Sequence, residues 1–535
     1  MANSLNNLVQ TLRHTLTCGC IAVVVCAFTQ PTVAQDSTPR NFSSDFRAID
    51  DSHEQHTFRK QVQPTGVVNS EEDDDAATER RLRQLEAEIA EIRSRVSKNA
   101  EPSAVQSASA EFVAPYYPVP PAPEGEPSDG QQPVCDVCPP GYTLQPLQKM
   151  FGTTDSLYPT IDVGGFIQLD SGWFIQEDAN TRAVGDIENK TGLRRVRVKF
   201  FGDIREDTSY LIDLDFAASG HPSFRDVVLQ FEDVPYVQNL RVGYFQQPFQ
   251  MNALTSGQHL DFMERLLPFA FAPFRKIGLS EHGTTSDERT QWAVSAYRFP
   301  TNDFGQSEGD SGGYALAARL THLPVYRNEG EQLVHVGLGY SLGDPGDNMV
   351  QYKIQPSFFV TDNGGSTNGG IDDIPVFVDT GPIRTNTYNL FNAEMAVNCG
   401  PFHVQSEATF SVVDQMRGPT LGFWGAYAFA GYFLTGETRP YDRQEGVFTL
   451  VDPDEEFTIQ RGGLGAWSVA AGWSFISLND ENIAGGKMNS LIFGLNWYQN
   501  SLVRVMFNYT YAFLDDPTVG GNQAQVFGVR TQVRF

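Results

Sequence analysis

The chain has 535 residues, of which 19% are charged, and its formal net charge is -27. A charge of this sign and size argues against a general polyanion-binding protein such as a nucleic-acid binder. The counts of glycine (48), phenylalanine (38) and tyrosine (19) favour β structure.

Residues 1–34 have the pattern of a secretory signal peptide. Arg13 and His14 precede the apolar run "LTCGCIAVVVCAF", which is too short to span a bilayer. The small residues that follow predict cleavage near Ala34. We therefore expect an exported protein.

Two later segments have compositions unsuited to a packed domain. Residues 35–75 are polar and end in the acidic run "EEDDD", which predicts disorder. Residues 101–159 are rich in proline, serine and alanine and are typical of a semi-extended linker.

Between these segments, residues 76–100 predict a short coiled coil. The apolar residues recur at intervals of three and four, as the a and d positions of one heptad seam do. Isoleucine at both core positions favours more than two strands. The seam consists of Leu82, Leu85, Ile89, Ile92 and Val96. With fewer than three full heptads, a lone amphipathic helix on a surface is the alternative reading.

The linker also contains "CDVCPP", a pair of cysteines at Cys135 and Cys138. Proline follows the second cysteine, so the haem-attachment pattern is absent, and no nearby Cys or His pair completes a zinc site. In an oxidising compartment we expect a local disulfide or a link between chains.

From residue 160 to residue 535 the sequence predicts an all-β fold, a transmembrane antiparallel β-barrel. Segments of about ten residues alternate apolar with small or polar residues and are separated by Gly, Asn, Asp and Pro turns. In "SLVRVMFNYTYAF", for example, Val505 and Tyr509 share one face while Arg504 and Asn508 share the other. The polar face includes bulky charged groups, which suits a water-filled lumen. The chain ends on an amphipathic strand whose last residue is Phe535, typical of outer-membrane proteins.

One predicted strand, "GLRRVRVKFFG", carries cations at alternate positions. If its apolar residues face lipid, then Arg195, Arg197 and Lys199 face the lumen, with Arg194 near the strand end. We call these three residues the cation column. The next strand carries Asp213 and Asp215, which could pair with the column and make it structural. Unpaired cations would instead recruit anions. The predicted anion path comprises Arg195, Arg197, Lys199, Arg241 and Arg504.

Three stretches make this region resemble the phosphate-selective porin O and P family. They are "RVGYFQQPFQMNALTSGQHLDFMERLLPFAFAPFRKIGL", "AYAFAGYFLTGETRPYDR" and "LIFGLNWYQNSLVRVMFNYTY". The resemblance implies a sixteen-stranded outer-membrane barrel, usually a homotrimer, that passes anions through an arginine-lined constriction with a loop folded into the lumen. The polar and cationic members of that implied loop are His259, Arg265, Arg275 and Lys276.

We therefore predict an outer-membrane porin for passive diffusion of small solutes, including anions such as phosphate. Acidic loops such as "VDPDEEF" would repel anions at the mouth, so a general non-selective porin is one alternative. A structural barrel tethered to the cell wall by its N-terminal arm is another. Membrane lipids and small anionic solutes are the expected partners.

An enzyme is not expected. We find no serine or cysteine hydrolase motif beside a histidine, no HExxH pattern and no carboxylate pair singled out by its spacing. The sequence also predicts no metal site and no cofactor.

Overall fold

The computed structural model describes residues 158–535 apart from 218–221, 303–304, 307–312, 359–373 and 461. The predicted signal peptide, coiled coil and cysteine pair lie outside the described residues. The predictions that fall there concern Ala34, Leu82, Leu85, Ile89, Ile92, Val96, Cys135 and Cys138.

Sixteen long antiparallel strands form the described domain, as predicted. They are β1 (Asp162–Gln176), β2 (Lys190–Arg205), β3 (Thr208–Asp215), β4 (Ser223–Val234), β5 (Gln238–Gln246), β6 (Arg275–Thr284), β7 (Thr290–Arg298), β8 (Tyr314–Arg327), β9 (Gln332–Asp344), β13 (Ile383–Cys399), β14 (Phe402–Gln415), β15 (Leu421–Phe433), β18 (Ala466–Asp480), β19 (Ile483–Tyr498), β20 (Val503–Asp516) and β21 (Gly520–Arg534).

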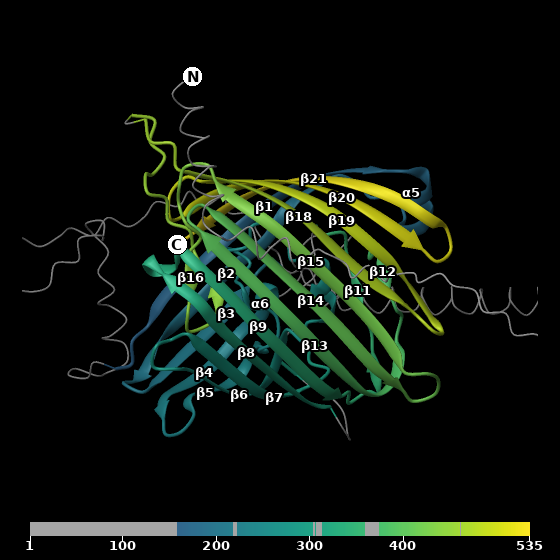
Figure 1. Cartoon of the computed structure of the whole chain (residues 1–535), viewed down its shortest axis with the longest axis horizontal. Helices are drawn as coiled ribbons and strands as arrows, with labels where there is room; N and C mark the ends of the chain where they lie inside the picture. The colour runs from purple at the N-terminus through teal and green to yellow at the C-terminus, as the bar shows by residue number, and fades with distance from the viewer. Residues whose placement is uncertain (1–157, 218–221, 303–304, 307–312, 359–373, 461) are drawn as a thin grey trace, which may run out of the picture. The chain divides into compact units, whose positions relative to one another are not determined.

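Each strand pairs with its neighbours in the chain, and β1 pairs with β21, so the sheet closes into a barrel (Figure 1). The closing register includes Phe166 opposite Arg534. Along β20 the predicted alternation is confirmed, because Arg504 and Asn508 are buried inside while Tyr509 is exposed outside. Closure leaves no strand edge, which is how a sheet satisfies its backbone in lipid.

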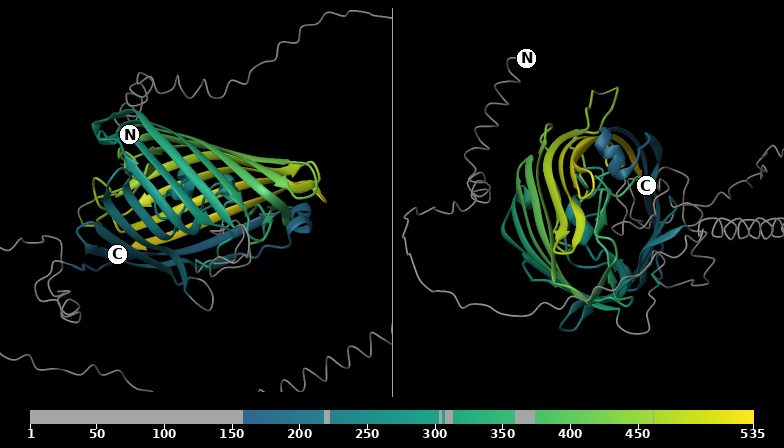
Figure 2. Two further views of the ribbon diagram at one scale, coloured as in Figure 1. Left: turned by 90° about the horizontal axis from the view of Figure 1, so that it is seen from below. Right: turned by 90° about the vertical axis from the view of Figure 1, so that its right-hand side faces the viewer.

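Short helices and small hairpins lie in the connections. The helices are α5 (Asp178–Val184), α6 (Met251–Leu254), η1 (Leu267–Phe271) and η2 (Asn328–Gly330), and the short strands are β10 (Met349–Val350), β11 (Lys353–Ile354), β12 (Val378–Asp379), β16 (Tyr441–Asp442) and β17 (Val447–Phe448). No described helix is long and apolar enough to cross a membrane. Figure 2 shows α5 at the end of the barrel opposite to the C-terminus.

The connection between β5 and β6, residues 247–274, lies inside the barrel, and we call it the inner loop. Its η1 packs against β14, β15 and β18. Two inward-facing glycines make room for it: a Cβ on Gly339 would lie 2.3 Å from the Phe249 carbonyl oxygen, and one on Gly425 would lie 3.3 Å from Pro268. Glycine thus lets the inner loop lie directly on the wall.

Apolar side chains of the inner loop form a core within the barrel. Phe249, Met263 and Phe271 are buried in a cluster with Phe423 of β15 and Met506 of β20. This cluster fills the lumen beside the later strands with side chains rather than water. Polar space therefore concentrates against the opposite wall, β2 to β6.

A second segment also enters the barrel, from the end that holds the C-terminus. The connection between β15 and β18, residues 434–465, includes the hairpin β16–β17. Its Arg439 lies 2.7 Å from Asp261 of the inner loop, and Arg319 of β8 donates to the Gly446 carbonyl at 2.7 Å. We call the part of this connection that lies inside, residues 437–451, the inner connection.

Candidate functional site: the cavity beside the inner loop

The cation column faces the interior, as predicted, but a β-bulge adds a fourth cation to it. Gln168 of β1 is opposite Arg195, whereas Leu169 is opposite Leu193, so Arg194 is the extra residue. The bulge turns Arg194 inward beside Arg195, and both side chains are buried. The sequence placed Arg194 near the strand end and gave no sign of the bulge.

One carboxylate of the inner loop receives these two arginines and a third. Glu264 lies 2.7 Å from Arg194, 3.2 Å from Arg195 and 2.7 Å from Arg530 of β21. Arg530 also pairs with Asp170 at 2.7 Å and donates to the Met263 carbonyl. We call Glu264 with its three arginines the loop anchor.

Burial alone would raise the pKa of Glu264, but Arg194, Arg195 and Arg530 lower it to about 2. The carboxylate is therefore ionised at neutral pH. Because three guanidinium groups share it, they are committed to holding the inner loop on the wall.

The other half of the cation column meets the carboxylates of β3. Arg197 donates to Asp215 at 3.1 Å, and Arg225 of β4 approaches the same carboxylate at 3.3 Å. Lys199 lies 3.8 Å from Asp213. Both aspartates thus lie close to the column. This is the arrangement expected if the column is structural.

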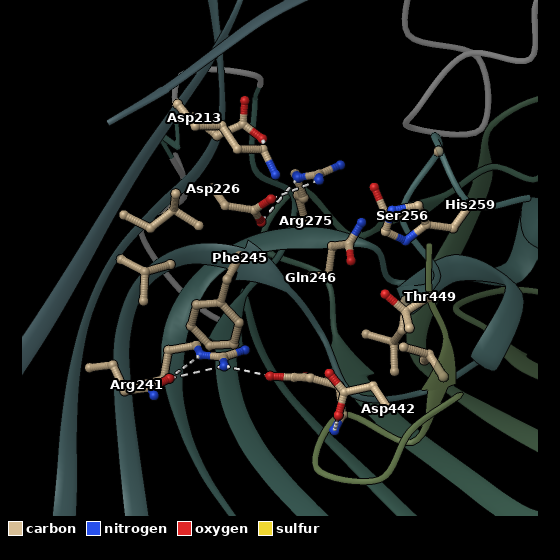
Figure 3. A pocket seen from close by; sticks show the side chains of 18 of the residues that line it. Asp213, Asp226, Arg241, Phe245, Gln246, Ser256, His259, Arg275, Asp442 and Thr449 are labelled. Atoms are coloured by element: carbon tan, nitrogen blue, oxygen red, sulfur yellow. Dashed lines mark hydrogen bonds and ion pairs between the residues drawn. The ribbon is translucent and has the colours of Figure 1, made fainter. Parts of the chain in front are cut away.

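A cavity of about 370 Å³ lies between β2–β6, the inner loop and the inner connection (Figure 3). It brings five of the predicted site residues together: Arg197, Lys199, Arg241, His259 and Arg275. Its carboxylates are Asp213, Asp226, Asp442 and Glu445. We call this space the lumen cavity.

Most charges of the lumen cavity are paired with one another. Arg275 donates to both oxygens of Asp226, at 3.2 and 2.8 Å. Arg241 donates to Gln230 and to Glu445, the latter at 3.1 Å. Arg241 draws the pKa of Glu445 below its usual value. The cations of the cavity thus lie beside carboxylates that partly neutralise them.

The remaining predicted residues have other surroundings. Arg504 donates to the Leu260 carbonyl at 2.8 Å, and Arg265 donates to the Thr255 carbonyl at 2.8 Å, so both stabilise the inner loop. Arg275 and Lys276 begin β6 and are not loop residues, which corrects the predicted position. Lys276 lines a separate small cavity beside Phe299.

Of the predicted residues that lie in the inner loop, His259 lines the lumen cavity and Arg265 does not. Burial, together with the positive charges of Arg534, Arg504, Lys199 and Arg439, lowers the pKa of His259 to about 3. The imidazole is therefore neutral at physiological pH, and it contributes a polar group rather than a charge.

The sequence analysis missed the inner connection as part of the site. Asp261 of the inner loop pairs with Arg439 and with His403, each at 2.7 Å. Burial would raise the pKa of Asp261, but these partners hold it below the usual range. The one available signal was length, because the other connections at that end of the barrel span only a few residues.

A closed sixteen-stranded barrel with a polar lumen and an inward loop defines the class of outer-membrane porins. The family model described as "Phosphate-selective porin O and P" matches residues 162–535. The chain belongs to this family, as the sequence predicted, and is an outer-membrane channel protein.

Similar proteins include porin O of Pseudomonas aeruginosa, which is 24% identical over 72% of this chain and 89% of its own length. Among solved structures, a trimer form of OmpT from Vibrio cholerae matches with a TM-score of 0.42 and 11% identity over 70% of this chain and 99% of its own. An anion-selective porin from Comamonas acidovorans matches with a TM-score of 0.42 and 10% identity over 70% and 99%.

Proposed function

We propose that the chain forms a water-filled pore for passive diffusion of small hydrophilic solutes, with a preference for anions. The observation that carries this proposal is the lumen cavity, where Lys199 and Arg241 keep side-chain exposures of 29% and 24%. The paired Arg197 and Arg275 keep only 5% and 4%. A passing anion thus has most access to Lys199 and Arg241.

The carboxylates of the cavity support a mild preference rather than a strong one. Asp226 and Glu445 stand beside the cations and repel an anion that approaches them. Family membership makes phosphate the first anion to test, and a general porin is the competing function.

Planar-bilayer recordings with purified protein test the proposal. We expect discrete channels, a reversal potential in a KCl gradient that favours chloride, and weaker chloride current when phosphate is added.

Replacing Arg195, Arg197 and Lys199 together with Gln removes the charge of the cation column and keeps side-chain polarity, so permeability should move toward potassium. An unchanged ion preference would mean that the column is structural. Bilayers without channels would overturn the pore itself.

We also propose a homotrimer whose subunits are joined at the heptad seam of residues 76–100. Isoleucine at both core positions supports more than two strands. Deleting residues 76–98 should weaken the oligomer on native gels while the barrel still assembles, because its strands complete their own hydrogen bonds. An unchanged oligomer would favour the tether to the cell wall, or a surface helix, over a clasp between subunits.

A further inference from the structure

Asp213 of β3 differs from the other carboxylates that line the lumen cavity. Its side chain is about 1% exposed, and neither oxygen accepts a hydrogen bond from any residue that the structure describes. Its ion-pair partner is Lys199, whose Nζ lies at 3.8 Å, beyond hydrogen-bonding distance. Buried carboxylates normally accept several hydrogen bonds. Asp213 therefore has unused acceptor capacity on the wall of the cavity.

Neighbouring carboxylates on the same wall do not share this property. Asp215 accepts from the Val196 amide at 3.1 Å and from Arg197 at 3.1 Å. Asp226 accepts two hydrogen bonds from Arg275. Figure 3 shows that pair beside Asp213. The unused capacity is thus specific to Asp213 rather than general to the wall.

The partner of Asp213 is also the most accessible charge of the column. The Lys199 side chain is 29% exposed, whereas that of Arg195 is 0% exposed. The Lys199 side of this loose pair is in contact with water and salt, so Lys199 can leave Asp213 at little cost to itself, whereas the buried Asp213 then needs a new partner. A solute can therefore exchange with this pair, provided that it supplies a new partner to each member.

The charges around the pair decide which solute does so. A lone cation at Asp213 is opposed by Lys199, Arg197 and Arg275, and a lone anion at Lys199 is opposed by Asp213 and Asp226. A molecule with an ammonium group and a carboxylate a few bonds apart replaces both halves of the pair at once. The cavity of about 370 Å³ has room for such a molecule with several waters, each of which takes up about 30 Å³.

We infer that the lumen cavity is an exchange site for small zwitterions of the amino-acid class. The ammonium group of the solute donates to Asp213, and its carboxylate binds Lys199. This inference rests on the proposed pore function and names a solute class for the same site. Binding is weak, as a site on a diffusion path must be if the solute is to leave it.

Proteoliposome swelling tests the inference with two isomers of equal size. Glycine is zwitterionic, and glycolamide has the same formula without charge, so the ratio of their entry rates isolates the effect of the charges. Asp213→Asn keeps the shape of the side chain and removes its charge. We expect it to lower the glycine-to-glycolamide ratio about fivefold, on the scale of one ordinary hydrogen bond.

Asp203→Asn is the matched control. Asp203 is an exposed carboxylate near the end of β2, outside the cavity, and the same change there should leave the ratio as it is. Lys199→Gln is the second arm, because this partly exposed side chain tolerates replacement even if Asp213→Asn fails to assemble. It should also lower the ratio, since it removes the partner of the solute carboxylate.

The outcomes separate this inference from the proposed function. If neither isomer enters liposomes that contain the wild-type protein, the pore function fails. If both enter and neither variant changes the ratio, the zwitterion site is wrong and Asp213 serves only to hold Lys199. A change in chloride preference alone also contradicts the zwitterion site, because a molecule without net charge does not respond to a simple charge filter.

Discussion

The two halves of the cationic face of β2 carry the same kind of side chain in different environments. Arg194 and Arg195 are buried against Glu264, which they share with Arg530. Lys199, four residues beyond Arg195, is partly exposed and lies 3.8 Å from Asp213. Buried, matched charges hold a structure together, whereas exposed, loosely paired charges remain available to a solute. A basic strand in a barrel thus combines an anchor and a site, and burial distinguishes them.

Replacing the shared carboxylate should have the largest effect. Glu264→Gln leaves three buried guanidinium groups around a neutral side chain, and breaking a buried pair in this way costs about 3–5 kcal/mol. We expect the folded band on unheated gels to convert to the unfolded band at a lower temperature. In bilayers the freed inner loop should give larger and noisier currents.

Glu232→Gln is the control for that variant, because Glu232 is an exposed carboxylate near the end of β4. It should behave as the wild type does on gels and in bilayers. Wild-type heat stability in Glu264→Gln would show that the inner loop is held by its apolar core and not by the loop anchor.

The next effect separates the two halves directly. Lys199→Gln should lower the chloride-to-potassium permeability ratio about two- to fivefold, because one unit charge at about 4 Å in water is worth about 1 kcal/mol. Arg195→Gln should leave that ratio nearly unchanged and instead lower heat stability, since Arg195 is committed to Glu264. Reversal potentials and gel shifts measured on both variants check the contrast. If both variants change the permeability ratio equally, Lys199 and Arg195 do not have separate roles as a solute contact and an anchor.

Strand periodicity was enough to predict the barrel and the direction of the cation column. Arg195, Arg197 and Lys199 face inward because period-two alternation leaves no other place for charges in a lipid-facing wall. The same periodicity could not show the bulge at Arg194, since a bulge adds one residue without changing composition. It also could not identify the partner of the column, because Glu264 is about seventy residues away in the chain.

The inner connection shows the second limit of the sequence. The stretch that contains Arg439 was used only as a mark of the family, and nothing local in it indicates that it enters the lumen. Its place depends on contacts with Asp261 and Arg319, which come from distant parts of the chain. Alternating apolar and polar residues predict the strands of a barrel wall, whereas segments that fill the lumen have no sequence period to detect.

The loop anchor should also be insensitive to moderate acid. The pKa of Glu264 is about 2 in the folded protein against an ordinary value of 4.5, so its stabilising contribution is complete above pH 4.5 and is lost as the pH falls toward 2. Single-channel currents should therefore keep the same open-state noise from pH 8 to about pH 5. A marked rise in open-state noise between pH 6 and 5 would contradict the anchor.

His259 should give the smallest effect of all. Its pKa of about 3 keeps the imidazole neutral, so the ion preference of the lumen cavity should show no step near the ordinary histidine value of 6.5. His259→Gln replaces one neutral polar group with another, and its permeability ratio should follow that of the wild type from pH 5 to pH 8. His259→Arg provides the sensitive control, because it adds a permanent cation at the same position and should move the ratio toward chloride. If the permeability ratio of the wild type changes near pH 6.5 and His259→Gln abolishes that change, the histidine is charged in the pore. The lumen cavity would then be more cationic than a neutral imidazole implies.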